Sequence, residues 1–291
     1  MKRILITGAT GNVGMIIIKY LFMNGVEEQI VAGVRNIPEA KSKFTENEKV
    51  EFVCFDFENP ETFKQALENI DLVFLLRPPH ISDVDRYFKP LIEAIRHSGI
   101  QKLIFLSVQG AEKSKVIPHN KIEKLIVQAG IPFIFLRPSY FMQNLTTTLL
   151  KDVQEKRKII LPAGNAKFNW IDIENIGEAV AVLVCKFQEY CNRAIEMTGY
   201  DNKNFSEVVD LINKNTAIEI VFINSGPFRF YRIKKQEGMQ KGMILVMILL
   251  HFIPRFQKEP RISDFYEKLT GKKPTGLNEF IQREKDKFEN K

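Results

Sequence analysis

The chain has 291 residues, of which 45% are hydrophobic, so it can bury a large core, and intrinsic disorder is excluded. Its 3 cysteines and 4 histidines match no disulfide framework and no metal-ligand spacing, so we expect reduced cysteines and no metal. The net charge of +7 belongs to residues 225–291, which hold 15 Lys and Arg against 8 Asp and Glu, and no nucleic-acid-binding motif accompanies this basic region.

Short apolar runs alternate with helical stretches over the first 150 residues, which is the pattern of a doubly wound sheet. The run at 72–76 is apolar at every position, as is typical of a parallel strand buried on both faces. We therefore predict an α/β fold, with a Rossmann-type doubly wound parallel sheet in residues 1–150. A small C-terminal α+β lobe on the substrate side, packed closely on the sheet, is predicted for residues 151–291. The predicted strands are 2–6, 29–34, 50–55, 72–76, 102–106 and 133–136, and the predicted helices are 13–23, 60–68, 83–98 and 121–129.

A glycine-spaced turn follows the first predicted strand and opens the first predicted helix. Gly8 can adopt the positive φ of a tight turn, Gly11 leaves room for phosphate oxygens, and Gly14 lets the helix pack closely on the sheet. The free N–H groups and the positive end of the helix then face an anion. The alternative is a turn with a structural role alone. We predict that a dinucleotide binds here, at Gly8, Thr10, Gly11, Asn12, Val13 and Gly14.

The residues that follow later strands are candidates for selecting the nucleotide, because ligands collect at the carboxyl edge of a parallel sheet. Arg35 follows the second strand, where a guanidinium suits a 2′-phosphate, so we expect NADP(H) rather than NAD(H); an ordinary surface arginine is the alternative. Asp56, followed by Phe57, is placed to accept from the adenine amino group. Leu76 and Arg77 are expected beneath the cofactor, with Arg77 either on a phosphate or at the surface.

Segments spread along the chain carry a family pattern: 7–14 (TGATGNVG), 34–36 (VRN), 119–123 (HNKIE), 130–132 (GIP), 136–138 (LRP), 141–144 (FMQN), 168–173 (FNWIDI) and 269–274 (LTGKKP). Together they resemble the NmrA-like branch of the atypical short-chain dehydrogenases/reductases, the branch that includes the type 2 quinone oxidoreductases. The resemblance covers almost the whole chain and implies an NADP-binding fold. It also implies cofactor contacts at Ser107, Val108 and Pro138, and a substrate pocket at Tyr140, Phe141 and Asn144, although core packing is an alternative for Phe141.

The resemblance also bears on catalysis. Typical reductases of the wider superfamily use a tyrosine and a lysine four residues apart, and the likeness puts Lys115 and His119 at these two positions, so the usual proton donor is absent. His119 and Ser107 are the remaining catalytic candidates. The alternatives are a histidine that only begins a helix and a serine that only ends a strand.

This absence favours an acceptor that needs no positioned acid. Reduction of a quinone gives an anion about as basic as a tyrosine phenolate, near pKa 10, which can take its proton from water. We expect an NADPH-dependent oxidoreductase acting on a quinone or another flat, electron-poor acceptor. The alternative is a non-catalytic regulatory protein that senses NADP(H).

The segment 243–253 is apolar on all sides but shorter than the roughly 20 residues that cross a bilayer. We expect it to be buried or to form a subunit contact, as in a homodimer. Lys241 and Arg255 flank it, so a membrane-surface role is the less favoured alternative. No export signal follows the first residues, and a cytoplasmic location is expected.

Overall fold

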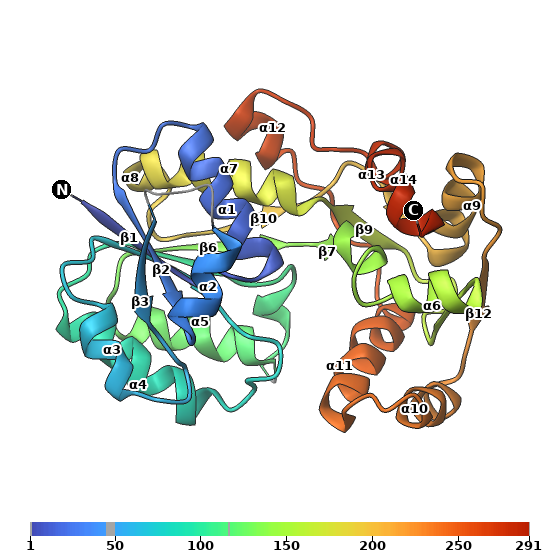
Figure 1. The fold of residues 1–291 in the computed structure, drawn as a ribbon, viewed down its shortest axis with the longest axis horizontal. Helices are drawn as coiled ribbons and strands as arrows, with labels where there is room; N and C mark the ends of the chain where they lie inside the picture. Colours follow the sequence, from blue (N-terminus) through green and yellow to red (C-terminus); the bar gives the residue numbers. More distant parts are fainter. Residues whose placement is uncertain (1, 45–49, 116, 291) are drawn as a thin grey trace. The chain divides into compact units, whose positions relative to one another are not determined.

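Seven parallel strands form the main sheet of the first of two compact units, in the order β10-β6-β5-β4-β1-β2-β3 (Figure 1). The computed structural model describes residues 2–44, 50–115 and 117–290. The order reverses between β1 and β4, which is the switch point of a doubly wound sheet. The predicted Rossmann-type fold is confirmed. The strands are β1 (Arg3–Thr7), β2 (Gln29–Val34), β3 (Val50–Cys54), β4 (Leu72–Leu76), β5 (Leu103–Leu106), β6 (Phe133–Pro138) and β10 (Arg193–Met197).

Helices cover both faces of this sheet, with α1, α7 and α8 on one face and α3, α4 and α5 on the other (Figure 1). The side chain of Asp83 accepts the N–H of Arg86 at 3.1 Å and so begins α4. α1 packs on α7 at Gly177, where a Cβ would lie 2.7 Å from Cγ2 of Ile16. The helices are α1 (Asn12–Met23), α2 (Ile37–Lys43), α3 (Glu61–Ala66), α4 (Val84–His97), η1 (Ala111–Lys113), α5 (Pro118–Gln128), α7 (Ile173–Cys185) and α8 (Phe187–Tyr190).

The second unit contains residues 139–172, 198–267 and 271–291. Two small sheets form in it, β11-β9-β7 and β12-β8. Its strands are β7 (Tyr140–Phe141), β8 (Lys158–Leu161), β9 (Phe168–Ile171), β11 (Asn202–Lys203) and β12 (Val221–Asn224). Its helices are η2 (Met142–Leu145), α6 (Leu150–Lys156), α9 (Phe205–Asn215), α10 (Pro227–Gln236), α11 (Lys241–Phe252), η3 (Ile253–Phe256), α13 (Leu277–Arg283) and α14 (Lys285–Glu289), and α12 (Phe265–Thr270) has residues in both units.

The division of the chain into two compact units does not coincide with the boundary that we predicted at residue 150. Residues 173–197 belong to the first unit, because β10 extends its sheet by pairing in parallel with β6, from Arg193 opposite Ile134 to Met197 opposite Pro138. The first unit is therefore assembled from separate stretches of the chain.

Two helices differ from the prediction. α2 was not predicted; it is short and begins where the side chain of Asn36 accepts the N–H of Glu39 at 3.2 Å. α5 begins at Pro118 rather than at residue 121, since proline fits the first turn of a helix, where its missing N–H costs nothing.

The apolar segment 243–253 corresponds to α11 and the first residue of η3. Ile244, Met247 and His251 are buried, but most of the other side chains of the segment are exposed. Burial of the whole segment, one of the two expected outcomes, is therefore wrong. In the part of the chain that the structure describes, no helix combines the length and the apolar character needed to cross a membrane.

Candidate functional site

The glycine turn lies at the carboxyl end of β1, at the switch point of the sheet. Gly8 has a φ of +64°, and the carbonyl oxygen of Gly8 accepts the N–H of Gly11 at 3.0 Å. A Cβ on Gly14 would lie 2.3 Å from that same oxygen, and a Cβ on Gly8 would lie 2.9 Å from Cδ2 of Leu76. The backbone of α1 at Gly14 therefore approaches the backbone of the turn at Gly8 too closely for a side chain at Gly14.

The first turn of α1 has no side-chain cap. Gly11 occupies the N-cap position, and no acidic residue lies in the first turn of the helix. The first N–H groups of an α-helix have no partner within the helix, and they carry the positive end of its dipole. Gly11 and Asn12 are exposed, so an anion can reach the start of the helix. The turn and the helix start therefore fit the diphosphate of a nucleotide.

β1 and β4 are tied together beside this turn. The N–H of Leu76 donates to the hydroxyl oxygen of Thr7 at 2.8 Å, and that hydroxyl donates to the carbonyl oxygen of Phe74 at 3.2 Å. Leu76 is half-buried against Gly8. Thr10 and Val13 are half-buried in the turn itself. The predicted cofactor residues from β1, α1 and β4 are thus brought together.

The residues predicted to select the nucleotide follow β2 and β3. Arg35 is exposed, and among the described residues it has no ion pair. Asp56 is half-buried, and one carboxylate oxygen accepts the N–H of Glu58 at 3.0 Å. The ring of Phe57 is buried against Phe88, with ring centroids 5.2 Å apart, so its side chain is part of the core.

Arg77 and His119 form a neighbouring pair. Nε of Arg77 donates to Nε2 of His119 at 3.4 Å, and the His119 ring lies 6.0 Å from the ring of Phe105. The Nη1 group of Arg77 donates to the carbonyl oxygens of Pro78 and Ile81 at 3.0 and 2.6 Å. Burial, and then the charge of Arg77, lower the pKa of His119 to about 3. The imidazole is therefore neutral near pH 7, with Nε2 acting as an acceptor.

Ser107 is buried and bonded to a buried ion pair. Its hydroxyl donates to Glu123 at 2.6 Å, and the guanidinium of Arg137 holds both carboxylate oxygens of Glu123, at 2.9 and 2.7 Å. Arg137 also pairs with the exposed Glu112 at 2.7 Å. Desolvation opposes the charge of Arg137, but the two carboxylates outweigh it and its pKa is raised. The Ser107 hydroxyl is therefore already committed as a donor and offers only acceptor capacity to a ligand.

Glu123 and Arg137 were not among the predicted site residues. The sequence does carry a signal for Glu123, because it lies on α5 beside the buried Ile122 and three residues before the buried Ile126. A charge on a buried helix face needs a partner of opposite charge.

The neighbouring Asn120 is also buried. Its amide nitrogen donates to the carbonyl oxygen of Ala111 at 3.0 Å, while its Oδ1 has no hydrogen-bond partner among the described residues. Two further predicted cofactor positions, Val108 and Pro138, are held by backbone bonds. The carbonyl of Val108 accepts the N–H of Ala111, and that of Pro138 accepts the N–H of Gln109.

The predicted substrate residues Tyr140, Phe141 and Asn144 belong to the second unit. The Tyr140 hydroxyl lies 2.9 Å from Nε2 of His251, and it is also hydrogen-bonded to the side chain of Asn144. Its ring packs edge-on against Trp170, with centroids 4.8 Å apart. Burial raises the pKa of Tyr140 well above its ordinary value and lowers that of His251 to about 4. This neutral pair fastens α11 to β7, and the role of these residues toward a substrate stays a prediction.

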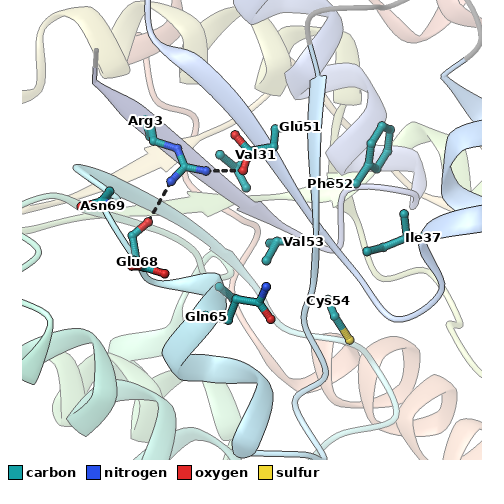
Figure 2. Close-up of a pocket in the computed structure, with 11 residues that line it drawn as sticks. Arg3, Val31, Ile37, Glu51, Phe52, Val53, Cys54, Gln65, Glu68 and Asn69 are labelled. Carbon is teal, nitrogen blue, oxygen red and sulfur yellow. Dashed lines mark hydrogen bonds and ion pairs between the residues drawn. The ribbon is translucent and has the colours of Figure 1, made fainter.

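Two hollows lie away from the glycine turn. One, of about 360 Å³, opens beside α3 near the first residues of β1 and β3, where Arg3 pairs with Glu51 and donates to the carbonyl oxygen of Glu68 at 2.9 Å (Figure 2). The other, of about 630 Å³, belongs to the second unit and is bordered by Tyr200 and Lys273. Over the described residues, no cluster of His, Cys, Asp and Glu could hold a metal ion.

Comparison with known proteins gives one consistent family. The profile of the NmrA-like family matches residues 1–281. Prestalk A differentiation protein A of Dictyostelium discoideum is 28% identical over 280 residues, which is 96% of this chain and 91% of that protein.

The solved structures that share the fold include a reductase and an oxidoreductase. The triphenylmethane reductase of Citrobacter sp., in complex with NADP(H), superimposes with a TM-score of 0.83 at 21% identity, covering 97% of this chain and 99% of that one. The NADPH-dependent quinone oxidoreductase of Escherichia coli, in complex with NADPH, gives a TM-score of 0.82 at 21% identity, covering 96% and 99%.

Proposed function

Because this chain belongs to the NmrA-like family, we propose that it binds NADPH and transfers a hydride from it to a quinone or a similar electron-poor acceptor. The observation that carries the proposal is the glycine turn, where the amides of an uncapped α1 are open to an anion and Gly14 leaves no space for a side chain. The triphenylmethane reductase and quinone oxidoreductase structures support the cofactor, since both hold NADP(H).

The chain offers donors and acceptors for each part of NADPH. The amides from Asn12 onward would hold the diphosphate, and Arg35, exposed and without an ion pair among the described residues, would take the 2′-phosphate. The carboxylate of Asp56 would accept from the adenine amino group. The Oδ1 of Asn120, which has no hydrogen-bond partner among the described residues, and the acceptor side of Ser107 would meet donors toward the nicotinamide end.

The residues near Ser107 and His119 favour an acceptor that needs no strong acid. A bound nicotinamide supplies the hydride. His119 is neutral at pH 7 because its pKa is lowered to about 3, and the Ser107 hydroxyl donates to Glu123, so neither offers a readily released proton. A quinone that gains a hydride becomes an anion whose conjugate acid has a pKa near 10. This anion takes its proton from water. The protein therefore contributes position more than acid–base chemistry.

The neutral His119 and the Ser107 hydroxyl that donates to Glu123 also favour a second candidate function. A family member with no poised proton donor would also serve as a regulatory protein that binds NADP(H) without turnover. In that case its conformation or its partners, rather than a product, would depend on the bound nucleotide.

Two measurements separate the candidates. Isothermal titration calorimetry with NADPH, NADP⁺ and NADH tests the cofactor, and oxidation of NADPH with a panel of quinones tests turnover. Turnover supports the oxidoreductase, while tight binding without turnover supports the sensor. If none of the nucleotides releases or absorbs heat, both proposals are wrong.

A further inference from the structure

α11 presents an apolar face to solvent. The helix has 12 residues and is therefore about 18 Å long. Ile244, Met247 and His251 form its buried stripe, and the opposite side carries no charged residue between Lys241 and Arg255. The exposed aliphatic side chains are Met243 (39%), Leu245 (44%), Val246 (44%), Leu249 (57%), Leu250 (45%) and Ile253 (43%).

Two aromatic side chains extend this apolar region. Phe228, at the start of the adjoining helix α10, is 88% exposed, and Phe256, at the end of η3, is 74% exposed. α10 and η3 both contact α11 in the second unit, where Figure 1 labels α10 and α11. Exposed apolar side chains gathered on elements that contact one another mark an interaction site.

The segments that carry the apolar face are rich in cations. Between residues 225 and 258 the chain has 7 Lys and Arg against 1 acidic residue, Glu237. Glu237 pairs with Lys156 and with Lys234, which lies 2.9 Å from it, so this carboxylate is already neutralised. The exposed cations that remain are Arg229, Arg232, Lys235, Lys241, Arg255 and Lys258, and none of them has an ion pair among the described residues.

This charge pattern indicates whether a second copy of the chain or a lipid bilayer covers the apolar face. A second copy of the chain, docked face to face, would bring the same cations together, and like charges across an interface oppose association. An anionic bilayer offers negative headgroups that attract the cations and acyl chains that bury the aliphatic side chains. Both the charged and the apolar groups therefore gain favourable contacts.

We propose that α10, α11 and η3 form a docking face for the surface of an anionic lipid bilayer. The helix axis of α11 would lie in the plane of the interface, with Leu249 and its neighbours immersed and the cations at headgroup level. Docking is peripheral, because 12 residues are too few to cross the bilayer. The proposal is independent of cofactor binding, which concerns the first unit.

The test is co-sedimentation of the full-length protein with vesicles. Vesicles of phosphatidylcholine alone are compared with vesicles of phosphatidylcholine mixed with phosphatidylglycerol, each at low and high salt. We expect binding to the anionic vesicles, weakened by salt, and little binding to the neutral ones.

Two double variants address the two halves of the surface. Leu249→Gln with Leu250→Gln removes exposed apolar groups, and Arg232→Gln with Lys235→Gln removes exposed charge. Each is expected to weaken partitioning by about tenfold or more. The matched controls are Val127→Gln, an apolar residue 53% exposed on α5, and Lys89→Gln with Lys124→Gln, exposed on α4 and α5.

Three outcomes would overturn the proposal. The first is no sedimentation with anionic vesicles, and the second is binding that the Leu249/Leu250 variant leaves unchanged. The third is a dimer, detected by analytical ultracentrifugation, that the same variant dissociates while vesicles bind nothing; a second copy would then be the occupant. Circular dichroism and the thermal midpoint verify that each variant is folded. Loss of NADPH binding or turnover would bear on the proposed function and not on this one.

Discussion

The hydroxyl of Ser107 donates a 2.6 Å hydrogen bond to Glu123, a carboxylate that is itself buried against the guanidinium of Arg137. This relationship fixes the direction in which the serine can act. Its proton points into the protein, and its lone pairs remain for a donor on a ligand. The ion pair behind it holds β6 to α5 and sets the position of the hydroxyl at the end of β5.

The two carboxylates around Arg137 should differ in their effect on stability. Glu123→Ala leaves a partly buried guanidinium without its bidentate partner, and we expect the free energy of unfolding to fall by about 3–5 kcal/mol. Glu112→Ala removes an exposed partner and should cost less than about 1 kcal/mol. Urea denaturation of both variants measures the difference. If both variants lose the same unfolding free energy, the burial of the carboxylate does not determine how much it contributes to stability.

Gly14→Ala should disrupt the turn that holds the diphosphate. Its Cβ would lie 2.3 Å from the carbonyl oxygen of Gly8, so the turn must shift, at a cost of about 2 kcal/mol or more in unfolding free energy. Gly242→Ala is the control, because nothing lies within 4 Å of its Cβ. We expect NADPH binding, measured by calorimetry, to be lost in the first variant alone. Retention of full affinity by Gly14→Ala would contradict the assignment of the turn.

Acid should destabilise the protein through two buried histidines. Burial, together with Arg77 for His119, lowers the folded pKa of His119 to about 3 and that of His251 to about 4, against 6.5 when unfolded. Between these values and pH 6.5 the unfolded chain binds more protons, so stability falls as pH falls through that window and is unaffected above it. At pH 5 the loss is about 2 kcal/mol for each histidine.

Unfolding by urea at pH 7 and pH 5 measures this loss. His251→Gln should reduce the difference between the two pH values, whereas His80→Gln, an exposed residue, should leave it unchanged. A variant that lacks His251 but retains the full pH dependence would rule out this source. In the same range, the pH profile of quinone reduction should show no inflection from His119.

The features that the sequence predicted well are local. Val34 ends β2 as expected, and the glycine turn lies between β1 and α1, because continuous apolar runs and a positive-φ glycine depend on few neighbours. β10 was missed because it is an edge strand in which only Ile195 and Met197 are buried, so its pattern alternates and resembles a surface strand.

Contacts between distant residues could not be predicted in the same way. Ser107 was a candidate as a serine that ends a strand, but its proton acceptor Glu123 lies 16 residues away on a helix. Tyr140 was expected to line a substrate pocket, but nothing in the sequence indicated that its hydroxyl is bonded to His251, 111 residues along the chain. Such pairs depend on how helices dock on the sheets, which periodicity does not encode.

Arg35 is the residue on which cofactor preference should depend. Arg35→Asp replaces a cation suited to a 2′-phosphate by an anion that repels it and accepts from ribose hydroxyls, so preference should shift from NADPH toward NADH. We expect a shift of at least about tenfold, or about 1.4 kcal/mol, in the ratio of the two dissociation constants from calorimetry. Arg86→Asp, exposed on α4, makes the same charge change elsewhere and controls for net charge. If both variants change the ratio equally, Arg35 does not contact the phosphate, and the preference arises from the field of the whole protein.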